Sequence, residues 1–120
     1  MLSNARCVST LAVSDMPRAR RFYEEALGLA VEADVVGTVR YSCAAGTALA
    51  IFERPMEPVD HTVAAFEIED LEGEVNELRG RGVEVEDIIT MPNGVKRAFF
   101  KDPDGNVIGM RQLPRATDRE

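Results

Sequence analysis

An internal repeat constrains this 120-residue chain more than any other feature. The segment VSTLAV begins at Val8, and the similar segment VAAFEI begins 55 residues later, at Val63. Each is followed by an acidic residue pair or Ser-Asp and then by an amphipathic stretch. The closing segments GTALAIF and GNVIGMR also match, at an offset of 59 residues. Self-similarity at such a spacing indicates a duplicated supersecondary unit. We therefore expect two copies of one unit, over residues 1–53 and 61–113, within a single domain of residues 1–120.

Each copy is predicted to contain one strand, one helix and three further strands. Apolar residues alternate in Val8–Val13, as expected for a strand with two unlike faces. Asp15 and Asp70 occupy N-cap positions ahead of stretches with apolar residues at three- and four-residue steps. Glu53–Asp60 contains two prolines and is predicted to link the copies. The fold class is therefore α+β, with further strands expected at 31–36, 39–43, 48–52, 83–89, 95–101 and 107–112.

Charge and composition exclude several classes of function. The formal charge is −7, and no basic stripe is present, so we expect no nucleic-acid partner and no membrane partner. No apolar run approaches the roughly 18 residues of a spanning helix, and the start lacks a signal-peptide core. Cys7 and Cys43 form no CxxC motif, which favours reduced thiols in a cytoplasmic protein. Asp102–Asn106 lacks the spacing of an EF-hand and is predicted to be a turn.

Three segments resemble the vicinal oxygen chelate superfamily, which includes glyoxalases, bleomycin resistance proteins and extradiol dioxygenases. They are VSDMPRARRFYEEALGL, FEIEDLEGEVNELRGRGV and AFFKDPDGNVIGMRQ. The resemblance covers about residues 6 to 113. It implies that two βαβββ units form curled mixed sheets around a central cavity. The units that enclose a cavity can come from one chain or from two chains of a dimer, and we expect a homodimer.

Enzymes of this superfamily usually hold a divalent metal at four strand positions, two in each unit, and the usual ligands are His or Gln and Glu. The resemblance places these positions at Val8, Ala50, Val63 and Gly109. None of these four residues has a side chain that can coordinate a metal. The sequence therefore predicts a branch without metal or other cofactor, and His61 alone cannot supply the three protein ligands of a catalytic zinc site.

The predicted cavity combines apolar walls with a few polar groups, as small-molecule sites do. Strand alternation places the lining residues on the same faces as the four metal positions. Tyr41 and Phe52 could stack on a planar ligand, and Arg111 could pair with a carboxylate or phosphate. The expected lining is Val8, Thr10, Tyr41, Cys43, Phe52, His61, Val63, Phe99 and Arg111. The expected ligand contacts among them are Thr10, Tyr41, Phe52, His61, Phe99 and Arg111.

Three functions are compatible with this pattern. The leading hypothesis is a protein that sequesters a small-molecule ligand or drug without metal, as in antibiotic resistance; the acidic net charge suits a cationic ligand. The alternative is a cofactor-free isomerase or lyase, whose acid–base group would be His61, Glu67 or Tyr41. A structural or regulatory dimer is the third. The sequence does not identify the ligand.

Overall fold

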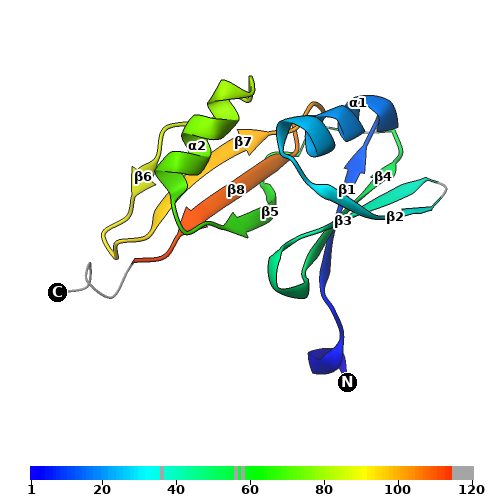
Figure 1. The fold of residues 1–120 in the computed structure, drawn as a ribbon, viewed down its shortest axis with the longest axis horizontal. Helices are drawn as coiled ribbons and strands as arrows, with labels where there is room; N and C mark the ends of the chain where they lie inside the picture. The colour runs from blue at the N-terminus through cyan, green and yellow to red at the C-terminus, as the bar shows by residue number, and fades with distance from the viewer. Residues whose placement is uncertain (36, 56, 58, 115–120) are drawn as a thin grey trace. The chain divides into compact units, whose positions relative to one another are not determined.

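A computed structural model describes residues 1–35, 37–55, 57 and 59–114 of the chain (Figure 1). It forms two compact units, Met1–Pro58 and Val59–Glu120, and each unit contains a four-stranded mixed sheet and a helix. The α+β class and the repeated strand–helix–strand arrangement are thus confirmed. Residues 56 and 58 of the predicted linker lie outside the described residues. In the described part of the chain, no helix has the length and apolarity needed to cross a membrane.

The first unit holds four strands in the order β1-β4-β3-β2. β1 runs parallel to β4, and the other neighbouring pairs are antiparallel. Short 3₁₀ turns precede β1 and separate β3 from β4. The strands are β1 (Val8–Val13), β2 (Ala30–Val35), β3 (Thr38–Ser42) and β4 (Ala48–Glu53).

The helix after β1 begins where the sequence predicts it. Asp15 is the N-cap of α1 (Met16–Arg20), and its Oδ1 accepts a hydrogen bond from the Arg18 backbone N–H at 3.1 Å. The helix then widens into a π-helical turn over Arg21–Ala26. A π turn inserts one extra residue into the helical repeat. The chain leaves this turn through Gly28, whose φ of +73° favours glycine.

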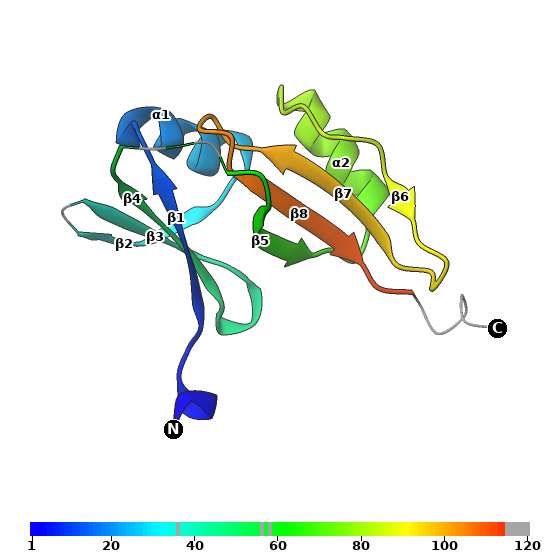
Figure 2. The same cartoon turned by 180° about the vertical axis from the view of Figure 1, so that it is seen from behind.

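The core of the first unit lies between this helix and one face of its sheet (Figure 2). Ala19 and Tyr23 of the helical segment are completely buried. The strand residues that pack on this side alternate along each strand, as the apolar pattern predicted. They are Leu11, Val13, Val39, Tyr41, Leu49 and Ile51.

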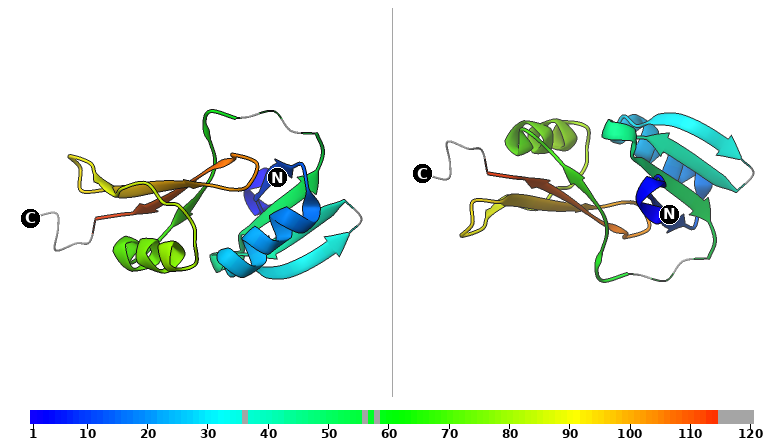
Figure 3. Two further views of the ribbon diagram at one scale, coloured as in Figure 1. Left: turned by 90° about the horizontal axis from the view of Figure 1, so that it is seen from above. Right: turned by 90° about the horizontal axis from the view of Figure 1, so that it is seen from below.

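The second unit repeats this plan with the strand order β5-β8-β7-β6. α2 (Leu71–Gly80) is capped by Asp70, whose Oδ1 accepts from the Gly73 N–H at 3.2 Å. Figure 3 shows α2 on one side of β7 and β8. Its buried residues Leu71, Val75 and Leu78 face a core that includes Ala98, Phe100, Ile108 and Met110. The strands are β5 (Thr62–Glu67), β6 (Ile89–Thr90), β7 (Lys96–Lys101) and β8 (Val107–Gln112).

The strand expected at 83–89 is wrong over most of its length. Only Ile89–Thr90 forms a strand, and Val85 makes an isolated bridge to Phe100. The Arg79 guanidinium donates a hydrogen bond to the Val85 carbonyl at 2.8 Å, so a side chain takes the place of a ladder partner. Val83 and Val85 are nevertheless buried, which explains their apolar character.

The predicted turn between β7 and β8 is confirmed. Asp102 is only 5% exposed, and its Oδ1 accepts from the backbone N–H groups of Asp104 and Asn106 at 2.9 and 2.8 Å. Its Oδ2 accepts from the Asn106 side-chain amide at 2.8 Å. The hydrogen bonds to these oxygens therefore stabilise the turn.

Candidate functional site

Each sheet has a second face that carries no helix of its own unit, here called the helix-free face. In the first unit, Thr10, Ala50 and Arg40 lie side by side on this face, since Thr10 pairs with Ala50 and Ala50 with Arg40. The next row includes Ala12, Phe52 and Thr38. Thr10 is exposed and Phe52 is half-buried. Two of the expected ligand contacts therefore share this face.

Tyr41 lies on the opposite face, so its expected role in lining the same face as Phe52 is wrong. It pairs with Leu49, a residue of the buried core, and is completely buried itself. Its ring stacks on Tyr23 with a centroid distance of 6.0 Å, and its hydroxyl donates to Glu24 Oε2 at 2.9 Å. Tyr41 is thus part of the contact between sheet and helix.

The surroundings of Tyr41 also argue against acid–base catalysis by its phenol. Burial, together with the hydrogen bond to Glu24, raises the pKa of Tyr41 above the range of a free tyrosine. The Arg20 guanidinium bonds to the same carboxylate at 2.6 Å and lowers the pKa of Glu24. The phenol therefore stays protonated at neutral pH and holds a structural hydrogen bond.

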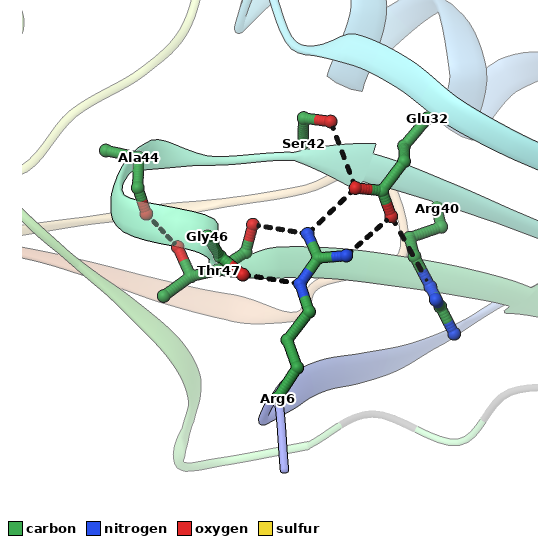
Figure 4. A network of polar contacts seen from close by, with 7 residues as sticks. All are labelled: Arg6, Glu32, Arg40, Ser42, Ala44, Gly46 and Thr47. Carbon is green, nitrogen blue, oxygen red and sulfur yellow. Dashed lines mark hydrogen bonds and ion pairs between the residues drawn. The ribbon is translucent and has the colours of Figure 1, made fainter. Parts of the chain in front are cut away.

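A polar network that the sequence did not suggest crosses the helix-free face of the first sheet (Figure 4). Arg6 forms an ion pair with Glu32 at 2.9 Å and donates hydrogen bonds to the backbone carbonyls of Gly46 and Thr47. Ser42 Oγ donates to Glu32 at 3.3 Å. The Arg6 hydrogen bond lowers the pKa of Glu32. The network joins the segment before β1 to the turn between β3 and β4.

Cys43 follows β3 near this network. Desolvation by burial raises the pKa of the Cys43 thiol, so the thiolate is disfavoured at neutral pH. This environment is that of an inert, half-buried residue. It does not provide the low pKa that a nucleophilic cysteine needs.

In the second unit, the helix-free face centres on Gly109. A Cβ at this position would lie 3.4 Å from Phe99 Cε1, 3.5 Å from Thr62 Cγ2 and 3.6 Å from Ala65 Cβ. These three side chains therefore converge over Gly109 and form an apolar floor. Phe99 is half-buried, and it pairs directly with Gly109 across β7 and β8.

Arg111 borders this floor and pairs with Glu67 across β5 and β8. Arg111 Nη2 lies 3.1 Å from Glu67 Oε1, and both side chains are more than half exposed. Arg97, which the sequence analysis missed, faces Arg111 from β7. Strand alternation from Phe99 could have identified it, because residues two apart share a face.

Strand alternation does not place His61 on this face, contrary to the prediction, because the residue lies outside β5. It precedes β5, its side chain is 69% exposed, and its Nδ1 lies 3.5 Å from Asp60 Oδ1. The pairing register shifts between Thr62 and Ala64. Thr62, and not Val63, therefore brings its side chain next to the Gly109 position.

The side chains present do not fit the metal site that the fold implies. Val8, Ala50, Val63 and Gly109 supply no oxygen, nitrogen or sulfur donor, and Thr62 would add only a neutral hydroxyl. Among the described residues, no group of three or more His, Cys, Asp or Glu side chains is arranged to hold a metal ion.

A groove of about 590 Å³ adjoins Phe99 at the end of β7. Its lining includes Lys101 and the acidic residues Glu84, Glu86 and Asp102. A second groove, of about 580 Å³, is lined in part by Glu67, Gln112 and Leu113. Phe99 is the one expected ligand contact that borders the first groove.

Solved structures with this fold include proteins of several activities. TnmS3, an antibiotic binding protein from Streptomyces sp. CB03234, is 30% identical, with a TM-score of 0.80; the match covers 94% of this chain and 98% of that one. A glyoxalase / bleomycin resistance protein from Catenulispora acidiphila DSM 44928 is 28% identical, with a TM-score of 0.77 and coverages of 92% and 100%. A lactoylglutathione lyase from Agrobacterium tumefaciens, at 24% identity, TM-score 0.70 and coverages of 91% and 93%, shares the fold.

No curated protein sequence matches significantly. The family model of the Glyoxalase/Bleomycin resistance protein/Dioxygenase superfamily matches residues 6–110, nearly the whole chain. The match spans β1 to β7 and β8 as far as Met110. The chain therefore belongs to the glyoxalase/bleomycin resistance protein/dioxygenase superfamily.

Proposed function

We propose that this protein binds a small molecule without a metal ion and releases it chemically unchanged. The donor set carries the proposal: the superfamily resemblance assigns the metal positions to Val8, Ala50, Val63 and Gly109, and none of these side chains offers a metal donor. The similar antibiotic binding protein supports a binding role for the same fold. Each helix-free face is a candidate binding surface by itself, with Thr10 and Phe52 as the proposed contacts in the first unit and Phe99 and Arg111 in the second.

The cofactor-free isomerase or lyase is the less favoured candidate. Each of its acid–base groups has a disadvantage in this structure: Tyr41 is buried in the core, Glu67 is ion-paired with Arg111, and His61 lies in the exposed segment before β5. Neither Glu67 nor His61 is among the three side chains that lie nearest the Gly109 position. Binding without turnover therefore agrees better with the geometry.

A thermal-shift screen tests the proposal. Chelator-treated protein is heated with a panel of anionic, neutral and cationic aromatic compounds, including antibiotics. Binding to the folded state raises the melting temperature, since a ligand at 100 times its Kd adds about 2.7 kcal/mol. We expect at least one saturable hit that mass spectrometry recovers unchanged after prolonged incubation. Conversion of the hit would support the enzyme instead, and no hit from a broad panel would contradict the proposal.

The first prediction concerns metal content. Protein expressed in medium supplemented with Ni, Zn, Mn and Fe should contain far less than one equivalent of any of them, because the four positions offer no donors. Elemental analysis of the purified, untagged protein measures this directly. One bound equivalent per chain would contradict it.

The second prediction concerns Phe52. Phe52→Ala should weaken several-fold the binding of a screened ligand that contacts the helix-free face of the first sheet, because stacking on a ring contributes about 0.5–1.5 kcal/mol beyond buried area. The variant should still fold, since the side chain is only half-buried. Calorimetric titration gives Kd, and circular dichroism checks folding. Tyr41→Phe is the matched control from the other face of the sheet and should leave Kd unchanged.

The third prediction is that the protein forms a homodimer in the cytoplasm. Val31 and Val35 on edge strand β2 are 42% and 66% exposed, and Ile89 on edge strand β6 is 49% exposed. Exposed apolar edge strands favour association. Light scattering at micromolar concentration should give about twice the 13.2 kDa chain mass. A monomer mass would refute the dimer.

The free thiols of Cys7 and Cys43 suit a reducing compartment, which supports the proposed cytoplasmic location.

A further inference from the structure

Two arginines face each other on the helix-free face of the second sheet. Arg97 on β7 pairs with Arg111 on β8, and Arg111 pairs in turn with Glu67 on β5. These three residues form one row across the sheet. Like charges directly opposite on neighbouring strands are destabilising, so this pair is not explained by sheet stability.

The charges in the row do not balance. Glu67 neutralises one guanidinium through its contact with Arg111. Arg97 instead lies over the Phe99 ring, with its Cζ 5.7 Å from the ring centroid. Among residues 1–35, 37–55, 57 and 59–114, no carboxylate lies within ion-pair distance of Arg97. The row therefore carries an excess positive charge on a protein whose net charge is −7.

An apolar surface adjoins the charged row. The next row across the sheet is Ala65, Gly109 and Phe99, over which Thr62 also places its methyl group. This arrangement joins two arginines to a flat apolar floor with one aromatic ring. A planar arginine fork matches a carboxylate, and a ring packs favourably on or edge-to-face with Phe99.

We propose that this face binds an aromatic carboxylic acid, with the carboxylate at Arg97 and Arg111 and the ring against Phe99 and Gly109. The proposal rests on the small-molecule binding argued above and names the class of ligand. Contacts at both ends would also fix the ligand in one orientation on this face. The groove beyond Phe99 is lined by three carboxylates and one lysine, Lys101, so its net negative charge would repel the ligand carboxylate from that side.

Three matched probes test the charge of the ligand. They are 2-naphthoate, the neutral 2-naphthamide and the cationic 2-naphthylmethylamine, each titrated into ¹⁵N-labelled full-length protein at low salt. We expect 2-naphthoate to bind at least several-fold more tightly than the other two. We also expect its largest amide shifts at Arg97, Phe99, Gly109 and Arg111. Shifts confined to the α2 surface around Glu74 would overturn the proposal.

Variants then test the arginines. Arg97→Gln should raise the Kd of 2-naphthoate roughly threefold to tenfold, as expected for an exposed but charge-assisted pair. Glu67→Gln should lower that Kd, because it removes the carboxylate that competes for Arg111. Arg81→Gln, at the end of α2, is the control and should change the Kd little. Each side chain is exposed, so thermal melting should show that all three variants fold.

The outcomes separate this proposal from the one it rests on. If 2-naphthoate fails to bind, or if the cationic probe binds more tightly, the carboxylate proposal is wrong, whereas the compound screen still decides whether the protein binds small molecules. If 2-naphthoate binds but neither Arg97→Gln nor Glu67→Gln alters its Kd, the assignment to this row is wrong. Opposite effects of these two variants on Kd would support it.

Discussion

Tyr41→Ala is expected to lower the free energy of unfolding by about 3–5 kcal/mol, as for other large aromatic residues deleted from a core. The side chain is completely buried against Tyr23, so its removal leaves a cavity between sheet and helix. Tyr41→Phe keeps the ring and should cost only about 1–3 kcal/mol, since it removes a single hydrogen bond to a charged group. Urea denaturation of the three proteins measures both differences.

The Glu24 carboxylate accepts the hydrogen bond from Tyr41 and provides an independent check on the cluster of Arg20, Tyr23, Glu24 and Tyr41. Arg20, and then Tyr41, lower the pKa of Glu24 in the folded protein. Stability from a lowered carboxyl pKa is present above the unfolded pKa and is lost as the pH falls through the folded one. Wild-type stability should therefore fall more steeply below about pH 4.5 than that of Glu24→Gln. Equal slopes, or a Tyr41→Ala variant as stable as wild type, would show that the cluster is not formed.

Asp102→Ala should produce the second large effect, a loss of about 2–4 kcal/mol, because it leaves several donors of the β7–β8 turn without their acceptor. The carboxylate accepts hydrogen bonds from the Asp104 N–H and from the N–H and side chain of Asn106. The exposed Asp60→Ala is the control and should change stability by less than about 0.5 kcal/mol.

This turn also matters for the proposed site, since it joins the two strands that carry Phe99, Gly109 and Arg111. Calcium should not raise the melting temperature, because the Asp102 oxygens are engaged by donors of the turn itself. Denaturation with and without calcium tests this alternative. A calcium-dependent increase of several degrees, together with a mild effect of Asp102→Ala, would contradict the turn-holding role.

Much of the fold could be predicted from local patterns. The repeat placed equivalent strands at β1 and β5, and Asp15 and Asp70 are the N-caps that their positions indicated. Alternation also identified the buried side of β1. These features depend on residues close in sequence, whose periodicity follows directly from strand and helix geometry.

The errors at the candidate site have two sources, alternation within a strand and pairing across the sheet. The polar Arg40 and Ser42 alternate with Val39 and Tyr41 along β3. This alternation already places Val39 and Tyr41 together in the core, which is why the predicted pocket position of Tyr41 is wrong. The position of His61 depends on a register shift in β5, which has no signal in a single sequence. Arg97 was overlooked although it lies two residues before Phe99.

Local chemistry and tertiary contacts explain the remaining differences between the predicted and the observed structure. The segment 83–89 has a strand-like apolar pattern, yet the Arg79 side chain takes a backbone carbonyl that a neighbouring strand would otherwise pair. The π-helical turn over Arg21–Ala26 has the same apolar spacing as an α-helix, so periodicity could not distinguish them. The polar network around Glu32 could not be predicted from the sequence, because it forms only when the fold brings Arg6 next to the turn before β4.

The central claim is that binding needs no metal and causes no reaction. The most direct test is calorimetric titration of the best compound from the thermal-shift screen into chelator-treated protein and into protein supplied with Ni, Zn, Mn or Fe. We predict the same Kd and the same stoichiometry in both, with the compound recovered intact. A Kd that improves strongly with one of these metals, or a compound converted to product, would contradict the account.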